Sequence, residues 1–195
     1  MEKKSAVILP PQFAPTAAYF RAIADHDYAF ICGDLRHDKR FKSVHRTEVA
    51  TPQGALRLTL PLSRRQAVAD EVSPYAAEAG EQLLWRHFAI SPHGQWWKTM
   101  RGTIATYYGA APYFDYYREF IEPFIDESWV GRSIVEFDCA LTAALLRALR
   151  ISTPVSASMP LNTEQLEITD LSRQAFDDGP GILHPLLTLG PDILK

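Results

Sequence analysis

The sequence has few of the features that mark secreted, membrane-spanning or nucleic-acid-binding proteins. Its two cysteines, Cys32 and Cys139, lie far apart and match no paired-thiol spacing, which argues against a disulfide framework and for a reducing compartment. The apolar run at residues 6–9 ends at Pro10 and falls short of the ~7–15 apolar residues of a signal peptide. No stretch approaches the ~20 apolar residues of a membrane helix, and the formal net charge is only -3. We therefore expect a cytoplasmic protein with no membrane span and no nucleic-acid partner.

Several signatures of catalysis are also missing. The chain contains no nucleophile elbow, no phosphate-binding P-loop and no glycine-rich dinucleotide fingerprint. None of its six histidines stands at metal-ligand spacing from another histidine, a cysteine or a carboxylate, so we predict no metal site. No motif identifies a cofactor.

The first third of the chain predicts strands. Short apolar runs at residues 5–9 and 28–32 flank a helical pattern at residues 16–25, an arrangement typical of a parallel βαβ unit. Residues 44–50 and 55–60 flank Thr51-Pro52-Gln53-Gly54, which is a hairpin signal. Residues 63–92 show only weak periodicity.

The second half predicts helices instead. Helical patterns cover residues 96–108, 112–121 and 133–149, and from Ile151 onward proline and glycine recur. We therefore predict one α/β domain over residues 1–195 with a small mixed or parallel sheet. Residues 1–62 form the sheet-rich part, residues 96–150 form a helical half packed on it, and residues 151–195 form an extended tail that wraps the core.

The most unusual local feature is a basic loop at residues 34–46, which contains five lysines or arginines and two histidines in a net-acidic protein. Such a loop favours a phosphate or carboxylate, and because it follows a strand it is expected at the sheet edge where α/β proteins bind ligands. A solvated loop is the alternative. We assign anion binding to the four cations Lys39, Arg40, Lys42 and Arg46.

The remaining candidate residues lie near that loop or on the predicted helices. Gln12, in the proline-rich loop after the first strand, is expected to orient the substrate, beside a helix N-terminus that favours anions. Asp34 or His45 is expected to handle protons, although a lone histidine more often only makes hydrogen bonds. The aromatic side chains of residues 96–117 favour the core over a stacking platform for a sugar or base.

Taken in order, these landmarks resemble the WbqC-like family. They are residues 8–15 (ILPPQFAP) before Tyr19-Phe20, then Val44-His45-Arg46, Gly54, residues 58–62 (LTLPL), Trp97, residues 108–117 (YGAAPYFDYY), Gln174-Ala175-Phe176 and Leu189-Gly190-Pro191. The resemblance implies a bacterial protein, from a family of which some members are encoded among genes for surface polysaccharide synthesis. It also implies transfer of glycine or another acyl group to a sugar.

The chain departs from this family pattern at several positions. His45 replaces an asparagine, Ser43 or Val44 replaces a tyrosine or tryptophan, Arg40 rather than Lys39 aligns with a lysine, and Met100 replaces a histidine. These differences indicate a divergent subgroup or a non-catalytic role.

The resemblance therefore implies a transferase for O-antigen-like polysaccharide, and with the basic loop it implies a substrate that is a small anionic molecule or a nucleotide-linked or lipid-linked sugar. A strand, a proline-containing loop and a helix also resemble the start of nucleotidyltransferase-like folds, which suggests activation of an amino acid by adenylation. The alternative is a non-catalytic binding or scaffold protein for a polysaccharide enzyme or its ligand. Convergence of Asp34, His45 and the cations on one pocket would favour the enzyme.

Overall fold

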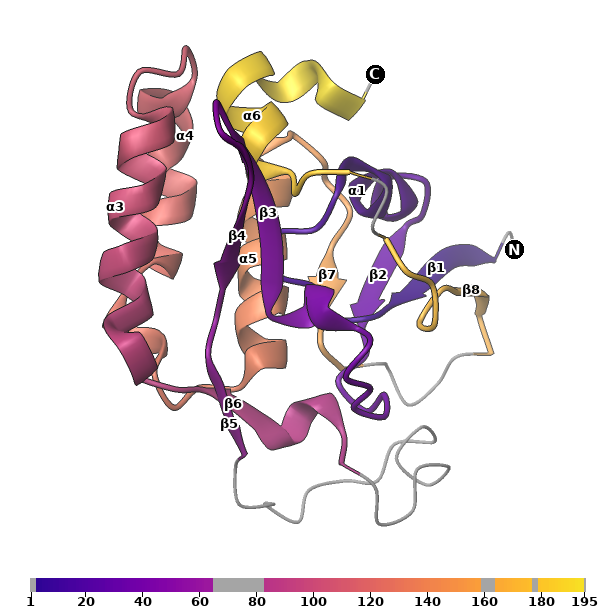
Figure 1. The fold of residues 1–195 in the computed structure, drawn as a ribbon. Helices are drawn as coiled ribbons and strands as arrows, with labels where there is room; N and C mark the ends of the chain where they lie inside the picture. The colour runs from indigo at the N-terminus through magenta and orange to yellow at the C-terminus, as the bar shows by residue number, and fades with distance from the viewer. Residues whose placement is uncertain (1–2, 65–82, 159–163, 177–178, 195) are drawn as a thin grey trace.

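The computed structural model describes residues 3–64, 83–158, 164–176 and 179–194 (Figure 1). Its centre is a sheet of four strands: β1 (Lys4–Leu9), β2 (Tyr28–Ile31), β7 (Val155–Ser156) and β8 (Leu166–Asp170). The strand order is β7-β2-β1-β8 and every neighbouring pair is parallel. Helix α1 (Ala17–Ala24) joins β1 to β2, so the predicted βαβ unit and α/β class are confirmed.

The two central strands are apolar because both faces of the sheet are covered there. The last four residues of β1 are buried, as are the last three of β2, which explains why each strand reads as a continuous apolar run. Edge strand β8 is mostly exposed and carries Glu167 and Asp170. Charged side chains on an edge strand discourage pairing with another chain.

Two antiparallel strand pairs lie outside this sheet. Strands β3 (Arg46–Thr51) and β4 (Gly54–Thr59) form the predicted hairpin, and β5 (Leu62–Arg64) pairs with β6 (Phe88–Ile90). Gly54, the first residue of β4, has a φ of +115°, which a side chain would strain. The predicted turn at residues 51–54 is therefore confirmed with its glycine in the position that requires one.

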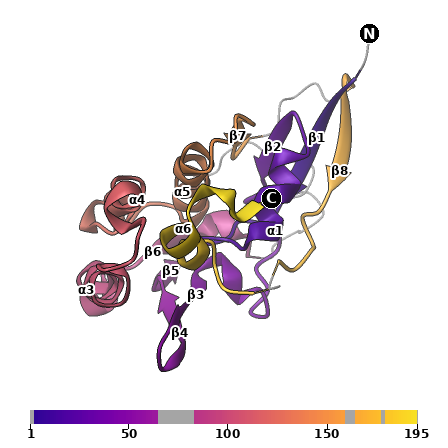
Figure 2. The same cartoon turned by 90° about the horizontal axis from the view of Figure 1, so that it is seen from above.

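The helical half contains α3 (Trp96–Tyr108), α4 (Phe114–Ile121) and α5 (Ile134–Ala148), close to the predicted ranges. Figures 1 and 2 show α3 and α4 on the far side of α5 from the parallel sheet. Among the residues with described positions, no helix combines the length and apolar character needed to cross a bilayer. Short 3₁₀ segments connect the elements: η1 (Lys42–Val44), η2 (Trp85–His87), η3 (His93–Gln95), η4 (Glu122–Phe124), η5 (Glu127–Trp129) and η6 (Pro191–Leu194).

The C-terminal segment has more regular structure than its composition predicted. Residues 151–195 were expected to form an extended tail, whereas the structure places β7, β8 and helix α6 (Leu183–Leu189) within them. The two strands are short or polar, and their pairing with β2 and β1 comes from distant backbone rather than from a local pattern. Helix α6 packs against α4 and β3, so this segment also covers the core.

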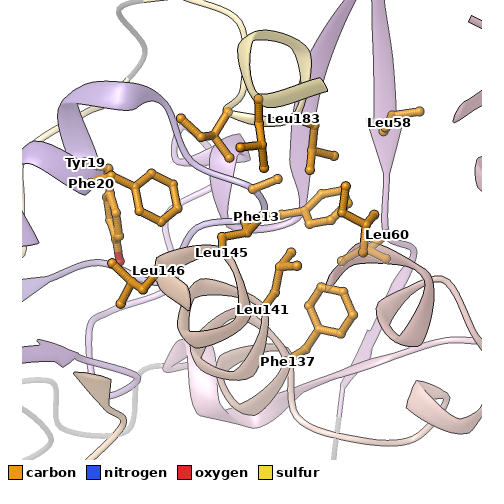
Figure 3. Close-up of a cluster of buried hydrophobic side chains, with 14 of the residues drawn as sticks. Phe13, Tyr19, Phe20, Leu58, Leu60, Phe137, Leu141, Leu145, Leu146 and Leu183 are labelled. Carbon is orange, nitrogen blue, oxygen red and sulfur yellow. The ribbon is translucent and has the colours of Figure 1, made fainter. Parts of the chain in front are cut away.

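The core joins all three parts of the chain. Figure 3 shows Phe13 from the loop after β1 among Leu60, Leu145 and Leu183. Phe13 also contacts Phe137 of α5, with ring centroids 5.8 Å apart. These contacts fix the loop after β1 against α5, and that loop carries one of the predicted site residues.

Candidate functional site

The parallel sheet has a topological switch point between β1 and β8. Along the chain its strands appear as β1, β2, β7 and β8, but β2 and β7 lie on one side of β1 and β8 lies on the other. In open α/β sheets with this arrangement, ligands bind outside the carboxyl ends of the strands at the switch point. The loops that follow β1 and β2 leave from this edge, and they carry most of the predicted site residues.

These two loops contact each other directly. The backbone N–H of Phe13 donates to the carbonyl oxygen of Ser43 at 2.9 Å, and the N–H of Cys32 donates to the carbonyl oxygen of Leu9 at 2.9 Å. Gln12 therefore lies beside the segment that contains His45 and Arg46. The structure thus places the loop of Gln12 next to the segment of His45 and Arg46.

Gln12 is the most buried of the three, with 1% of its surface exposed. Neither its amide nitrogen nor its amide oxygen has a hydrogen-bond partner among the described residues. Buried amides almost always have partners in folded proteins, so an unpartnered one needs an explanation. A ligand group that both donates and accepts hydrogen bonds would supply both partners.

His45 is uncharged at neutral pH. Burial lowers its pKa to about 4, and the nearby charges of Arg46 and His37 act in the same direction. Its Nδ1 is buried and has no partner within the described part of the chain. A pKa so far below neutrality makes the ring a weak general base, which favours a hydrogen-bonding role over proton transfer.

Arg46 begins β3 and is half-buried. Its Nε is buried without a partner in the described ranges. A guanidinium group held in place by the start of a strand can bind a phosphate or carboxylate in a bidentate fork. Arg46 is the least exposed of the four predicted cations.

The other three predicted cations lie at the surface. Lys39, Arg40 and Lys42 are exposed. Arg40 also pairs with Asp38 at 2.7 Å with 89% of its side chain exposed, and this pairing lowers the pKa of Asp38 to about 2. These three cations are therefore more exposed than Arg46.

Asp34 follows β2 and forms an ion pair with Arg86 at 2.8 Å. Backbone hydrogen bonds also join the segment that carries Arg86 to the loop after β2. The N–H of Arg86 donates to the carbonyl oxygen of Gly33, and the N–H of Trp85 donates to that of Leu35. Arg86 was missed in the sequence because residues 63–92 have weak periodicity and the pairing is long-range. It adds a second half-buried arginine to this edge of the sheet.

His37, a residue of the basic loop, contacts the segment at residues 84–88. Its ring stacks on Phe88 with centroids 4.5 Å apart and meets Trp85 at 4.6 Å. Burial lowers its pKa, with Lys39 contributing to the same effect. The ring therefore serves to pack residues 84–88 against the basic loop.

The aromatic residues of the helical half divide into two groups. Trp96, Tyr108 and Tyr117 are buried, as is Met100, which confirms the core interpretation for these residues. Three tyrosines are exposed: Tyr107, Tyr113 and Tyr116. None of the three belongs to the loops at the carboxyl edge of the sheet.

The residues at this edge suit an anion better than a metal ion. Within residues 3–64, 83–158, 164–176 and 179–194, no group of three or more histidine, cysteine, aspartate or glutamate side chains is placed to hold a metal. Cys32 is buried, and burial raises the pKa of its thiol to about 11, so it is not a ready nucleophile. The remaining polar groups at this edge include the guanidinium groups of Arg46 and Arg86, the carboxylate of Asp34 and the buried amide of Gln12.

Comparison with known proteins gives one family. The model of the WbqC-like protein family matches residues 10–177, which includes both loops and the segment that carries Arg86. No curated protein and no solved structure matches the chain.

Proposed function

The chain belongs to the WbqC-like protein family, and from that premise we propose that it is a transferase in bacterial surface polysaccharide biosynthesis. The group transferred is glycine or another acyl group, and the acceptor is a sugar linked to a nucleotide or a lipid. The protein acts in the cytoplasm, where such activated sugars are made.

The observation that supports this proposal is the arrangement of Gln12 and Arg46 at the carboxyl edge of the sheet. Arg46 offers a charged fork for the phosphate of an activated sugar. Gln12, on the adjoining loop, offers an amide for an uncharged part of the same molecule. A site with one cationic part and one neutral polar part suits a molecule with a phosphate at one end and a sugar at the other.

Asp34 is the residue we propose for proton transfer. It follows β2 at the same edge, and Arg86 holds its carboxylate in place at 2.8 Å. An acceptor hydroxyl must lose a proton as it attacks an acyl group, and a carboxylate within hydrogen-bond reach can take that proton. His45, with a pKa of about 4, fits better as a neutral hydrogen-bonding group.

The acyl group must be activated before transfer. In the proposed sequence, glycine and ATP form glycyl-adenylate and release pyrophosphate. The sugar hydroxyl then attacks the acyl carbon, its proton goes to Asp34, and AMP leaves. In chain order the strands β7-β2-β1-β8 are arranged 3-2-1-4, as in the first four strands of a dinucleotide-binding sheet, which supports a nucleotide at the switch point.

A non-catalytic binding protein is the second candidate. The weak basicity of His45 favours it, as does Met100 at the position where the resemblance implies a histidine. Such a protein would bind the same anionic sugar through Arg46 but would not turn it over.

A calorimetric titration tests both candidates. UDP-N-acetylglucosamine, ATP and CTP are titrated into the wild type, Arg46→Ala and Arg147→Ala, the last being an exposed arginine on α5. We expect Arg46→Ala to weaken binding by about tenfold or more, which corresponds to about 1.4 kcal/mol, and Arg147→Ala to change nothing. Wild-type protein that binds none of the three, or an Arg46→Ala variant that binds as well as the wild type, would refute the site.

Mass spectrometry then separates the enzyme from the binder. The wild type is incubated with glycine, ATP and UDP-N-acetylglucosamine, and the sugar is examined for an added glycyl group. A product that Asp34→Asn fails to form supports the transferase. Binding without any product, with ATP left intact, supports the binding protein.

A further inference from the structure

Two polar side chains inside helix α5 have no place in the proposed reaction. Asp138 and Thr142 are both fully buried. Both carboxylate oxygens of Asp138 and the hydroxyl of Thr142 lack a hydrogen-bond partner among the residues that the structure describes. Gln12 is also buried with an unpartnered side chain among the described residues, and such groups need an explanation.

The two helix residues lie on one stripe of α5. Val135, Asp138 and Thr142 are three and four positions apart, so they share this stripe. A Cβ on Gly33, just after β2, would lie 2.9 Å from two carbons of Val135, so the first residue of the stripe packs against the carboxyl end of β2.

Asp138 also lies close to the loop after β1. The hydroxyl of Tyr19 donates to the carbonyl oxygen of Pro10 at 2.8 Å, at the start of that loop. Burial raises the pKa of the Tyr19 phenol, and the nearby Asp138 acts in the same direction. Phe137, the residue before Asp138, packs on Phe13, the residue after Gln12. Asp138 therefore lies behind the loop that carries Gln12.

The side chains of Asp138, Thr142 and Gln12 are all uncharged. An unpaired carboxylate in the core would be strongly destabilising, and burial raises the pKa of Asp138 well above its usual range. A neutral carboxylic acid, a threonine hydroxyl and an amide each offer a donor and an acceptor. Such a set recognises a group that itself donates and accepts, and it offers no charge to hold an anion or a cation.

We propose that Asp138, Thr142 and Gln12 form an internal binding site for a hydroxyl group. Two sources share this chemistry: an enclosed water molecule, or a hydroxyl of the sugar substrate. The second source rests on the function proposed above, whereas the first does not. The site extends the anion-binding edge inward, from Arg46 through Gln12 to α5.

Infrared spectroscopy tests the internal site without any ligand. The difference spectrum between the wild type and Asp138→Asn at neutral pH should contain the carbonyl band of a protonated carboxylic acid, at the position of a hydrogen-bonded acid. Thr142→Val should shift this band, because it removes one hydroxyl from the site. Glu136→Gln, which changes an exposed acid on the same helix, should remove only a carboxylate band.

Two results would overturn the proposal. One is an acid band at the position of a free, unbonded carboxylic acid that Thr142→Val leaves in place. The other is a carboxylate band from Asp138. If Asp138→Asn does not fold, the infrared difference spectrum between the wild type and Thr142→Val still shows whether the acid band shifts.

Titration with UDP and with UDP-N-acetylglucosamine identifies the source of the hydroxyl. If the hydroxyl belongs to the sugar, only UDP-N-acetylglucosamine should shift the acid band. Thr142→Val should then lower the affinity for UDP-N-acetylglucosamine about tenfold and leave the affinity for UDP unchanged. If the hydroxyl belongs to an enclosed water molecule, neither UDP nor UDP-N-acetylglucosamine should shift the acid band of Asp138. If the wild type binds neither ligand, the proposed function fails, and the infrared spectra alone still decide whether the internal site exists.

Discussion

The hydroxyl of Thr47 donates a hydrogen bond to the carbonyl oxygen of Ala14 at 3.0 Å, which joins hairpin strand β3 to the loop after β1. The C-terminal segment is joined at the same place, because the N–H of Gly181 donates to Glu48 at 3.0 Å and that of Ile182 donates to Pro15 at 2.8 Å. The loop that carries Gln12 is thus held by two distant parts of the chain.

Replacement of Gly181 by alanine should strongly destabilise the protein. The added Cβ would collide with the side chain of Thr47 and lie 2.7 Å from the carbonyl oxygen of Ala14, and backbone there cannot move aside cheaply. We expect a loss of about 2–4 kcal/mol in the free energy of unfolding, measured by urea denaturation. Gly102→Ala on α3 is the control: nothing lies within 4 Å of its new Cβ, and a gain of about 0.5–1 kcal/mol is expected. Equal effects at the two glycines would contradict the packing.

Gln12→Leu should separate binding from stability. Leucine has a similar volume, and the amide that it replaces makes no hydrogen bond to the described protein. We expect the free energy of unfolding to change by less than about 1 kcal/mol, while the affinity for UDP-N-acetylglucosamine falls about tenfold. Gln53→Leu in the exposed hairpin turn should leave the affinity unchanged. A large loss of stability would instead assign Gln12 a structural role.

The pKa of His45 predicts how stability depends on pH. The folded pKa is about 4 and lies below the ordinary value of 6.5, so the unfolded chain binds more protons between these pH values. Stability should therefore be complete above pH 6.5 and fall on acidification toward pH 4. Because the ring is partly exposed, we expect a loss of only about 1–2 kcal/mol.

His45→Asn should lack this part of the pH dependence, since asparagine does not titrate. Thermal unfolding of both proteins from pH 4 to pH 8 gives the comparison, and an NMR titration of the His45 ring gives its pKa directly. A ring that titrates near its ordinary value would show that the site is more open to water than the structure indicates.

The pairing of Asp34 with Arg86 predicts a measurable coupling. Both groups are half-buried, at 2.8 Å, so each variant alone leaves its partner with less compensation. A double-mutant cycle of Asp34→Ala and Arg86→Ala, read by urea denaturation, should give a coupling of about 1 kcal/mol. The exposed pair Arg57 and Glu48 serves as the control and should give less. Additive effects at Asp34 and Arg86 would remove the argument that Arg86 orients the carboxylate.

The exposed cations should contribute only long-range attraction. Lys39→Ala and Lys42→Ala should each weaken the binding of UDP-N-acetylglucosamine by about twofold in dilute buffer, and that loss should vanish near 1 M salt, where the Debye length is about 3 Å. Arg40→Ala should do less still, because Asp38 already pairs with that side chain. The loss caused by Arg46→Ala should persist at high salt. A loss at Lys39 that also persists would place this lysine in direct contact with the ligand.

The parts of the fold that follow from local patterns were predictable from the sequence. Apolar runs gave β1 and β2, a turn with glycine gave the β3–β4 hairpin, and periodicity gave α3 and α5. Strands β7 and β8 were missed because they are too short or too polar to stand out, and only their partners in the sheet make them strands.

The positions of the candidate residues follow in part from the strand pattern. Gln12 and Asp34 come from the segments that follow β1 and β2, His45 precedes β3 and Arg46 begins it, whereas their role as a site stays a prediction. A list of charges cannot tell which cations turn outward, so Arg40 and Arg46 looked equivalent in the sequence. Nor does any local signal mark Asp138, which stands in an amphipathic helix and becomes unusual only once its burial is known.

The position of β8 beside β1 has a consequence for synthesis on the ribosome. Strand β1 is made before the neighbour that covers its second edge, because that neighbour comes from residues 166–170. Until that segment emerges, the nascent chain carries an apolar strand with one open side, and such edges invite association with other chains. The sheet should therefore be completed only after residues 166–170 have emerged, and a chaperone that binds extended apolar segments would have its best target in β1.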